Sequence, residues 1–428
     1  MYFKNLLSKY KKNEEDLNDY NIRISNLNGI LQIAAANLVL PFAIMFAKRL
    51  YATDFQIALM SSLPAIVSVG VIIPGAIYVK RCINKQAVTG RLFILSRLFY
   101  LLFAIIPLLT KQYRASIFIL LYGFMNLPGS IAVVAWQSFI ADLFPPFLRA
   151  HALALRNRLS AYIGIIITLI AGWILYYIPK NDVQRLFLYQ IFFCIAFIVS
   201  LFEVYSFYKH KLTDSKKCAI ADQTTSAQGN LYFRIKNAYL ELKSSKRFIT
   251  FIVCAFVFHI SWYMAWPLFS LYEIDFLHSN ELWTSIIVTV NGISQATSFI
   301  YWSKLSQKRS NGFALAIAIM GMALCPLLYP LTNSLYILLP VSVIGGVATS
   351  GVSLILLNTL FEVSPDKNRT LYIAYYNTMI NLTLTFSPFI GIALKNKFNI
   401  TIAFFIAFAA RVFAGIFFIM RYKKEERT

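Results

Sequence analysis

Long apolar segments separated by short polar ones dominate the pattern of residues along this chain. Each segment has about 20 residues, the length that a helix needs to cross the hydrocarbon core of a bilayer. The apolar residues are continuous and do not alternate with polar ones, which excludes the strands of a membrane β-barrel. Twelve such segments are present, at residues 29–49, 55–79, 91–110, 115–141, 159–178, 185–207, 248–270, 280–302, 313–331, 334–358, 371–394 and 400–420.

Six of these segments precede residue 208 and six follow residue 247. The pattern therefore predicts an all-α membrane protein whose twelve transmembrane helices form two six-helix bundles. We expect five parts along the chain: a cytoplasmic N-terminal segment (1–28), a first bundle (29–207), a cytoplasmic linker (208–247), a second bundle (248–420) and a basic cytoplasmic tail (421–428).

The second part of the linker, residues 231–247, mixes aromatic and aliphatic residues with lysines and arginines. This mixture predicts a basic amphipathic helix that lies on the inner leaflet. A solvated linker helix fits the same pattern equally well.

Composition agrees with a membrane protein, because 58% of the residues are hydrophobic and only 14% are charged. The net charge of +22 raises the question of a nucleic-acid partner. With the N-terminus inside, however, about three quarters of the 40 Lys and Arg residues fall on cytoplasmic segments. This asymmetry follows the positive-inside rule. It predicts a multi-pass protein of the plasma membrane with both termini in the cytoplasm, in contact with anionic lipids and not with nucleic acid.

The 5 cysteines are scattered and show no spacing typical of a metal site or a disulfide framework, so we expect no metal and no other cofactor. The first apolar segment is too long for the core of a cleavable signal peptide. We expect it to stay in the membrane as an anchor.

A charged motif occurs twice, between the fourth and fifth segments and between the tenth and eleventh. The copies are Asp142-x-x-Pro145-x-x-x-Arg149-x-x-x-x-Ala154-x-x-Asn157 and Glu362-x-x-Pro365-x-x-x-Arg369-x-x-x-x-Ala374-x-x-Asn377. A shorter echo pairs Tyr51-x-x-Asp54-Phe55 with Tyr272-x-x-Asp275-Phe276. Repeats at half the chain length indicate that each half is one structural unit.

Both charges of the motif oppose the dipole of their own helix. Asp142 follows a helix C-terminus and Arg149 begins the next helix, where the partial charges have the same sign as the side chain. Each therefore needs another partner. An acid and a base about 4 Å apart attract by roughly 4 kcal/mol at an effective dielectric of about 20, enough to bias two conformations. Solvated turns that face lipid headgroups are the alternative interpretation.

The motif resembles the cytoplasmic motif of major facilitator superfamily transporters, and the twelve segments, the half-length repeat and the basic linker are similar to that family along the whole chain. The resemblance implies two parallel repeats related by an axis normal to the membrane. It also implies that charge networks close the cytoplasmic side, and it assigns this gate to Asp142, Arg149, Glu362 and Arg369.

The loops after the second and eighth segments depart from the family pattern Gly-x-Leu-x-Asp-Arg-x-Gly. They keep basic residues but lack the acid, as in Val79-Lys80-Arg81 and Gln307-Lys308-Arg309. The Gly-Pro pair of drug/proton antiporters is also missing from the fifth segment. We therefore expect an altered gate network, and the subfamily is not resolved.

Polar side chains inside the apolar segments are costly and point to function. The resemblance implies that helices 1, 4, 7 and 10 line a central cavity, with help from 2, 5, 8 and 11. Aromatic and amide groups there suit an organic solute better than a bare ion, although each can instead bridge helices. The candidate substrate-binding residues are Asn37, Asn126, His259, Trp262, Tyr263, Asn291, Gln295, Asn377 and Asn381; Trp266, Ser298 and Thr385 extend the same stripes.

Three further residues could carry charge inside the membrane. His259 could bind a coupling proton, or it could only pack between helices. Glu203 lies near the cytoplasmic end of its segment and is expected to reach water. Arg411 is expected to donate hydrogen bonds between helices and not to bind an anion.

Together these features predict a secondary active transporter that moves a small organic solute by alternating access, as a monomer, with a proton or cation as a possible coupling ion. Efflux of a drug, a peptide or another amphipathic metabolite by the same fold is the alternative. A membrane-embedded enzyme is less favoured, because no His, Asp, Glu or Cys residues converge at one depth. A non-transporting sensor is less favoured too, because no large regulatory domain is present.

Overall fold

The computed structural model describes residues 2–82, 84–212, 245–364 and 369–425, and within these ranges all its regular elements are helices, joined by short turns, with no strand. Helices satisfy their own backbone hydrogen bonds, which hydrocarbon requires. The predicted amphipathic helix of the linker lies largely outside the described residues.

Each of the twelve predicted segments is helical. In chain order the elements are α1 (Tyr2–Asn37), η1 (Leu40–Phe42), α2 (Ala43–Arg49), α3 (Asp54–Arg81), α4 (Lys85–Ile105), η2 (Ile106–Leu108), α5 (Lys111–Phe124), α6 (Asn126–Leu143), α7 (Pro146–Tyr177), α8 (Asp182–Tyr208), α11 (Lys246–Met264), α12 (Trp266–Leu271), η3 (Tyr272–Phe276), α13 (Glu281–Lys308), α14 (Asn311–Leu328), η4 (Tyr329–Leu331), α15 (Leu335–Val363), α16 (Arg369–Lys397) and α17 (Ile400–Glu425).

Eleven stretches in the described part of the chain are long and apolar enough to cross a membrane. The twelfth predicted segment corresponds to α13, which is long enough but too polar to meet the same criterion. Its polarity comes from the residues that made it a candidate lining helix, such as Asn291 and Gln295.

Three of the segments are interrupted. The first breaks at Pro41 between α1 and α2, the fourth near Met125 between α5 and α6, and the seventh at Ala265 before Pro267. Proline removes a backbone donor and clashes with the preceding turn, so it ends or bends a helix. The interrupted segments are three of the four that are expected to line a cavity.

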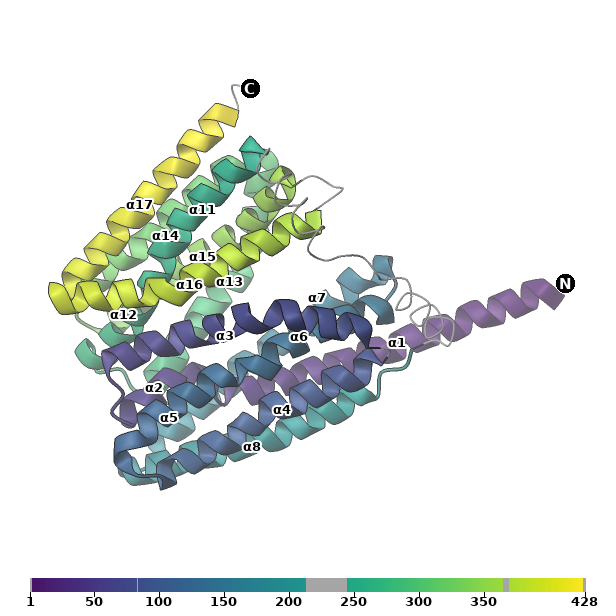
Figure 1. Cartoon of the computed structure of the whole chain (residues 1–428), viewed down its shortest axis with the longest axis horizontal. Helices are drawn as coiled ribbons and strands as arrows, with labels where there is room; N and C mark the ends of the chain where they lie inside the picture. Colours follow the sequence, from purple (N-terminus) through teal and green to yellow (C-terminus); the bar gives the residue numbers. More distant parts are fainter. Residues whose placement is uncertain (1, 83, 213–244, 365–368, 426–428) are drawn as a thin grey trace. The chain divides into compact units, whose positions relative to one another are not determined.

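The chain divides into two compact units: Met1–Phe46 with Gly70–Gln228, and Ala47–Val69 with Gly229–Thr428. In the first unit, α1 packs against α7 and α8, and α4 packs against α6 and α8. In the second unit, α11 packs against α16 and α17, and α14 packs against α15 and α17 (Figure 1). The first, third, fourth, fifth and sixth helices of each half thus make the same pairs. This common packing confirms the duplication that the repeated motif predicts.

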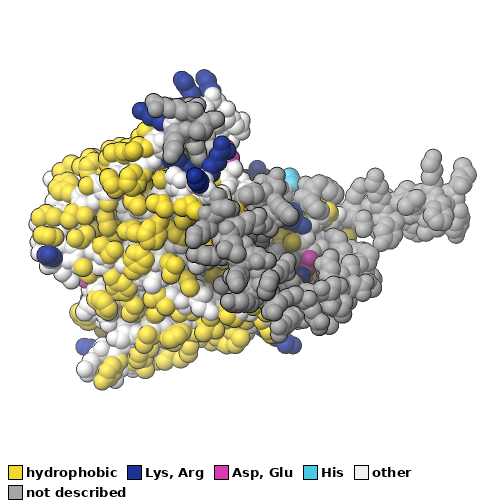
Figure 2. All heavy atoms as spheres, turned by 45° about the horizontal axis from the view of Figure 1, so that its top comes forward, with side chains coloured by type: hydrophobic (Ala, Val, Ile, Leu, Met, Phe, Trp, Pro, Cys, Tyr) yellow, Lys and Arg dark blue, Asp and Glu magenta, His cyan; other side chains and the backbone are white. Residues whose placement is uncertain are grey.

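The helices expose apolar side chains and turn polar ones inward. On α8 the exposed stripe contains Ile198, Phe202 and Tyr205, whereas Ser200 and Glu203 are completely buried. Figure 2 shows hydrophobic side chains covering a broad area of one face, with Lys and Arg gathered at its edge. Such a surface suits lipid, and the chain is a multi-pass membrane protein.

Candidate functional site

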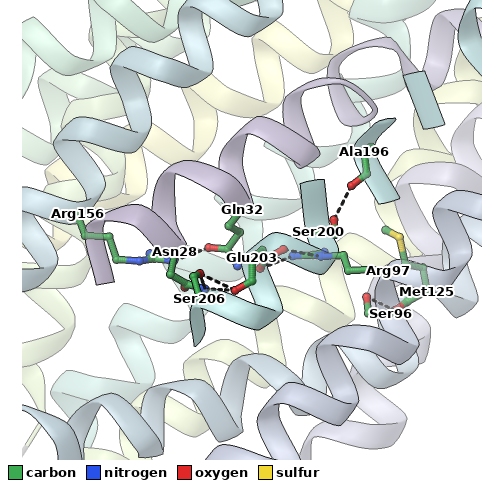
Figure 3. Close-up of polar contacts among 10 residues, drawn as sticks. All are labelled: Asn28, Gln32, Ser96, Arg97, Met125, Arg156, Ala196, Ser200, Glu203 and Ser206. Carbon is green, nitrogen blue, oxygen red and sulfur yellow. Dashed lines mark hydrogen bonds and ion pairs between the residues drawn. The ribbon is translucent and has the colours of Figure 1, made fainter. Parts of the chain in front are cut away.

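A buried ion pair lies inside the first unit, between α4 and α8 (Figure 3). The carboxylate of Glu203 accepts hydrogen bonds from Arg97, 3.1 Å from Nε and 3.2 Å from Nη2. The Glu203 side chain has no exposed surface, and that of Arg97 is 13% exposed. The two parallel hydrogen bonds form the fork that arginine makes with carboxylates.

The expectation that Glu203 reaches water is therefore wrong. Its position on α8 places it on the inward face, between two turns of lipid-facing apolar residues. A carboxylate in such surroundings would be very unfavourable alone, and Arg97 supplies the opposite charge that it needs. The sequence shows both residues but not that their helices pack together.

Asn28 connects this pair to α1. Its amide Nδ2 donates to the backbone carbonyl of Glu203 at 2.9 Å and to the hydroxyl of Ser206 at 3.3 Å. The Ser206 hydroxyl in turn donates to the same Glu203 carbonyl at 2.7 Å. The first, third and sixth helices of this half thus meet at one polar network (Figure 3).

A second arginine reaches this region from α7. Arg156 is 7% exposed, and its Nη2 donates to Oε1 of Gln32 at 2.5 Å. Its guanidinium lies 4.8 Å from the ring centre of Trp136, on α6, within the range of a cation–π interaction. Figure 3 shows the side chain pointing toward Gln32 and Asn28. In the part of the chain that the structure describes, no carboxylate forms an ion pair with Arg156.

The sequence pattern does not identify Arg156 as a site residue. The pattern places the start of the fifth apolar segment at residue 159, so Arg156 is counted among the cytoplasmic charges. In the structure α7 starts at Pro146, and the candidate membrane span begins at His151. The available signal was the spacing of Arg156 and Ser160, which puts both on one helix face.

The two candidate asparagines of this half make different contacts. Asn37 faces α7, where a Cβ on Gly164 would come within 2.7 Å of its Nδ2. Asn126 donates to the carbonyl of Tyr122 at 3.1 Å, at the break between α5 and α6. Asn126 therefore satisfies a carbonyl that the break leaves free.

In the second unit, α11 carries an aromatic cluster. His259 is 2% exposed and packs against Trp262 and Tyr263, with ring centres 5.7 and 5.5 Å away. Tyr376, on α16, completes the cluster 5.9 Å from His259. Nδ1 of His259 lies 2.7 Å from the carbonyl oxygen of Ala255 and so donates to it. The i, i+3, i+4 spacing predicts the α11 face but not its partner on α16.

The amides of α13 face α15. Asn291 donates to the carbonyl of Ser342 at 3.2 Å and accepts from Gln295 at 2.6 Å. One turn further, the hydroxyls of Ser298 and Ser350 are 2.6 Å apart. The contacts to Ser342 and Ser350 bridge α13 and α15, which is the alternative role of buried polar groups.

On α16, Asn377 is exposed, and Asn381 donates back to its carbonyl at 2.9 Å. These amides lie on the helix that also carries Tyr376. Asn377 therefore keeps its side chain available on the surface of the second unit.

The motif acids find partners at the start of the neighbouring helices. Asp142 accepts from Nζ of Lys85 at 2.7 Å, and Glu362 accepts from the amide of Asn311. Lys85 and Asn311 are the first residues of α4 and α14, so the contact is repeated in the two halves. Arg149 donates instead to carbonyls at the end of α6, with 2.7 Å to that of Ala141. The side chain of Arg369 lies outside the described part.

The shorter sequence echo also becomes a contact. Within the second unit, Nζ of Lys48 lies 3.2 Å from Asp54 and 2.8 Å from Asp275, the two acids of the echoed segments. Lys395 also binds Asp54. The adjacent pair of Arg49 and Glu281 is 2.5 Å apart. We call these six residues the ionic cluster.

Arg411 behaves as predicted. It is 1% exposed and donates to the backbone carbonyls of Met322, at 2.7 Å, of Trp262, at 3.3 Å, and of Ser261, at 3.4 Å. It thus fastens α17 to α11 and α14. Across the described residues, no group of three or more His, Cys, Asp or Glu side chains is placed to hold a metal ion.

Comparison with known proteins gives a consistent family. A sequence model of the Major Facilitator Superfamily matches residues 26–332 and 251–428. No curated protein matches the chain. Among solved structures, the nucleoside transporter NupG is 12% identical with a TM-score of 0.72, covering 94% of this chain and 100% of its own.

Two further structures have the same fold. A D-xylose-proton symporter is 14% identical with a TM-score of 0.68, covering 93% of this chain and 96% of its own. A bacterial homolog of the human lysosomal transporter Spinster is 14% identical with a TM-score of 0.66, covering 95% and 97%. Twelve helical segments, a duplicated packing scheme and a family match along nearly the whole length lead to one conclusion: the chain belongs to the Major Facilitator Superfamily of membrane transporters.

Proposed function

We propose that the protein is a secondary active transporter that moves a small organic solute across the plasma membrane by alternating access, as a monomer with both termini in the cytoplasm. The aromatic cluster of His259, Trp262, Tyr263 and Tyr376 carries this proposal. Flat aromatic faces beside amide groups suit organic solutes. Most of the cluster lies on α11, which corresponds to one of the helices that the family resemblance implies line a central cavity.

The two charged regions support alternating access. We assign the inner gate to Asp142, Arg149, Glu362 and Arg369, with Lys85 and Asn311 as the partners of the acids. We assign the outer gate to the ionic cluster, whose opposite charges are held at the ends of helices. Ion pairs of this kind are individually weak near water, so they can form and break during a cycle.

We further propose that a proton is the coupling ion, with His259 as the residue to test. The D-xylose-proton symporter shares the fold.

Uptake measurements test these proposals. Metabolites inside and outside cells that overproduce or lack the protein are compared, and solutes that differ are tested in vesicles containing the purified chain. We expect saturable uptake that a pH gradient accelerates and that His259→Ala impairs. Vesicles that move no differing solute would contradict the transport proposal. Wild-type uptake with unchanged pH dependence in His259→Ala would show that His259 does not bind the coupling proton.

A further inference from the structure

The buried polar network of the first unit has an unbalanced charge. Arg97, Arg156 and Glu203 are its largely buried charged side chains, and together they carry one net positive charge. Both oxygens of Glu203 are bound by Arg97. Arg156 therefore has no carboxylate of its own among the described residues, and an uncompensated charge in a low-dielectric region is strongly unfavourable.

Two polar groups beside Arg156 also lack hydrogen-bond partners in the described structure: its own Nε and the hydroxyl of Ser160. Both face Gly29 of α1, since a Cβ at Gly29 would lie 2.8 Å from Nε and 2.8 Å from the Ser160 oxygen. The two unsatisfied donors thus lie side by side against the backbone of α1, where the lack of a side chain at Gly29 lets them approach closely. Buried donors normally have acceptors, so this arrangement points to an acceptor from outside the chain.

We propose that Arg156, Ser160 and Gln32 bind the carboxylate of a singly charged organic anion, which is the transported solute; this identification rests on the proposed function. One carboxylate would neutralise the excess charge of the network. It would accept from Nε and Nη2 of Arg156, the fork that suits a planar carboxylate. Gln32 would then release Nη2 and donate its amide to the same group. Trp136, which already lies against the guanidinium, provides an aromatic wall for the organic part of the solute.

Thermal stability of the purified full-length protein in detergent tests the carboxylate site. The probes are acetate and benzoate, with uncharged acetamide and benzamide as controls of similar shape, at an ionic strength held constant with sodium sulfate. Ligand binding raises the melting temperature in a saturable way. We expect a saturable rise with at least one acid and none with its amide.

Variants locate the effect. Hydrogen bonds to a charged group are worth enough that Arg156→Gln should weaken the apparent affinity by about 10- to 100-fold. Arg158→Gln removes the same charge from an exposed position two residues away and should change nothing. Ser160→Ala and Gly29→Ala leave the charge in place. They should weaken affinity by about 3- to 10-fold, so they decide the matter if Arg156→Gln does not fold.

No saturable shift with either acid, or the same affinity in the Ser160→Ala and Gly29→Ala variants as in the wild type, would overturn the proposal. Uptake of labelled benzoate by vesicles separates it from the proposed function. Arg156-dependent binding without uptake supports the site and contradicts transport. Uptake of an uncharged solute that Arg156→Gln leaves unchanged supports transport and contradicts the site.

Discussion

Single buried charges in the first unit depend on a partner, and the pair of Arg97 and Glu203 is the clearest case. Removing one member of a buried pair leaves the other charge uncompensated, which costs roughly 3–5 kcal/mol. We therefore expect Glu203→Gln to lower the stability of the protein in detergent by about that amount, measured by thermal or denaturant unfolding.

The double variant Arg97→Leu with Glu203→Leu is the control for this prediction. Replacing both charges by apolar residues removes the desolvation cost together with the attraction. It should be more stable than Glu203→Gln alone. A double variant as unstable as the single one would show that the pair is held for another reason.

His210 follows α8, outside the membrane-spanning segments, and couples stability to pH. It is 4% exposed, and its pKa is lowered from 6.5 to about 4. Burial is the main cause; the bond to the Phe207 carbonyl opposes the shift, and the nearby charge of Arg156 adds to it. Nδ1 donates to that carbonyl at 2.8 Å, so protonation would place a second hydrogen on Nε2, which has no partner among the described residues.

The sign of the effect follows from proton binding. Between pH 6.5 and pH 4 the unfolded chain holds a proton at His210 that the folded protein does not. Stability should be full above pH 6.5 and fall as the pH decreases, by as much as about 3 kcal/mol. His210→Gln should flatten this part of an unfolding curve measured from pH 4 to 8. An unchanged curve would mean that His210 does not titrate in this range.

At the scale of elements, close contacts between helices depend on glycine. On α15, a Cβ at Gly346 would lie 2.5 Å from the backbone oxygen of Asn291 on α13, and backbone atoms cannot move aside. Small residues allow such approach in membrane proteins, where hydrophobic burial does not drive helices together. We expect Gly346→Ala to separate α13 from α15 and to lower stability by about 1–3 kcal/mol.

Gly321→Ala, on α14, is the matched substitution. Its new Cβ would meet Ala348 at 3.5 Å, an ordinary van der Waals distance. Thermal unfolding of this variant should match the wild type closely. Equal losses from both substitutions would contradict the role assigned to the α13–α15 contact.

The whole molecule is expected to alternate between two states, and the two proposed gates should act in opposite directions. Lys48→Met breaks the ionic cluster, so it should favour the state open to the outside. Arg149→Ala removes the bonds at the end of α6, so it should favour the state open to the inside. The measurement is the rate at which an impermeant maleimide labels Thr385→Cys in a cysteine-free background; Thr385 lies in the half of α16 that the proposed orientation places toward the outside.

Labelling should rise in Lys48→Met and fall in Arg149→Ala. Arg158→Ala, which removes an exposed charge from α7, should leave the rate unchanged. Identical rates in all three variants would show that neither charged region controls access to Thr385.

The sequence by itself determined the positions of the twelve helical segments and the duplication, because hydrocarbon accepts only helices in continuous apolar runs. It did not determine where the helices begin, since α1 and α7 start well before their apolar residues. It also predicted that Arg411 donates hydrogen bonds between helices, as it does to three backbone carbonyls of α11 and α14. The gate assignments and the candidate ligands remain predictions that rest on position along the chain.

Only the tertiary structure decided which polar side chains meet. Glu203 lies inside and not in water, the echoed acids Asp54 and Asp275 share Lys48, and Tyr376 joins His259. Arg156, which the sequence pattern counts among the cytoplasmic charges, is a buried cation with no carboxylate partner among the described residues. Contacts between helices distant in sequence depend on how each helix is rotated about its own axis. Packing between helices sets this rotation. The pattern of apolar residues does not, because these segments are apolar around most of their circumference.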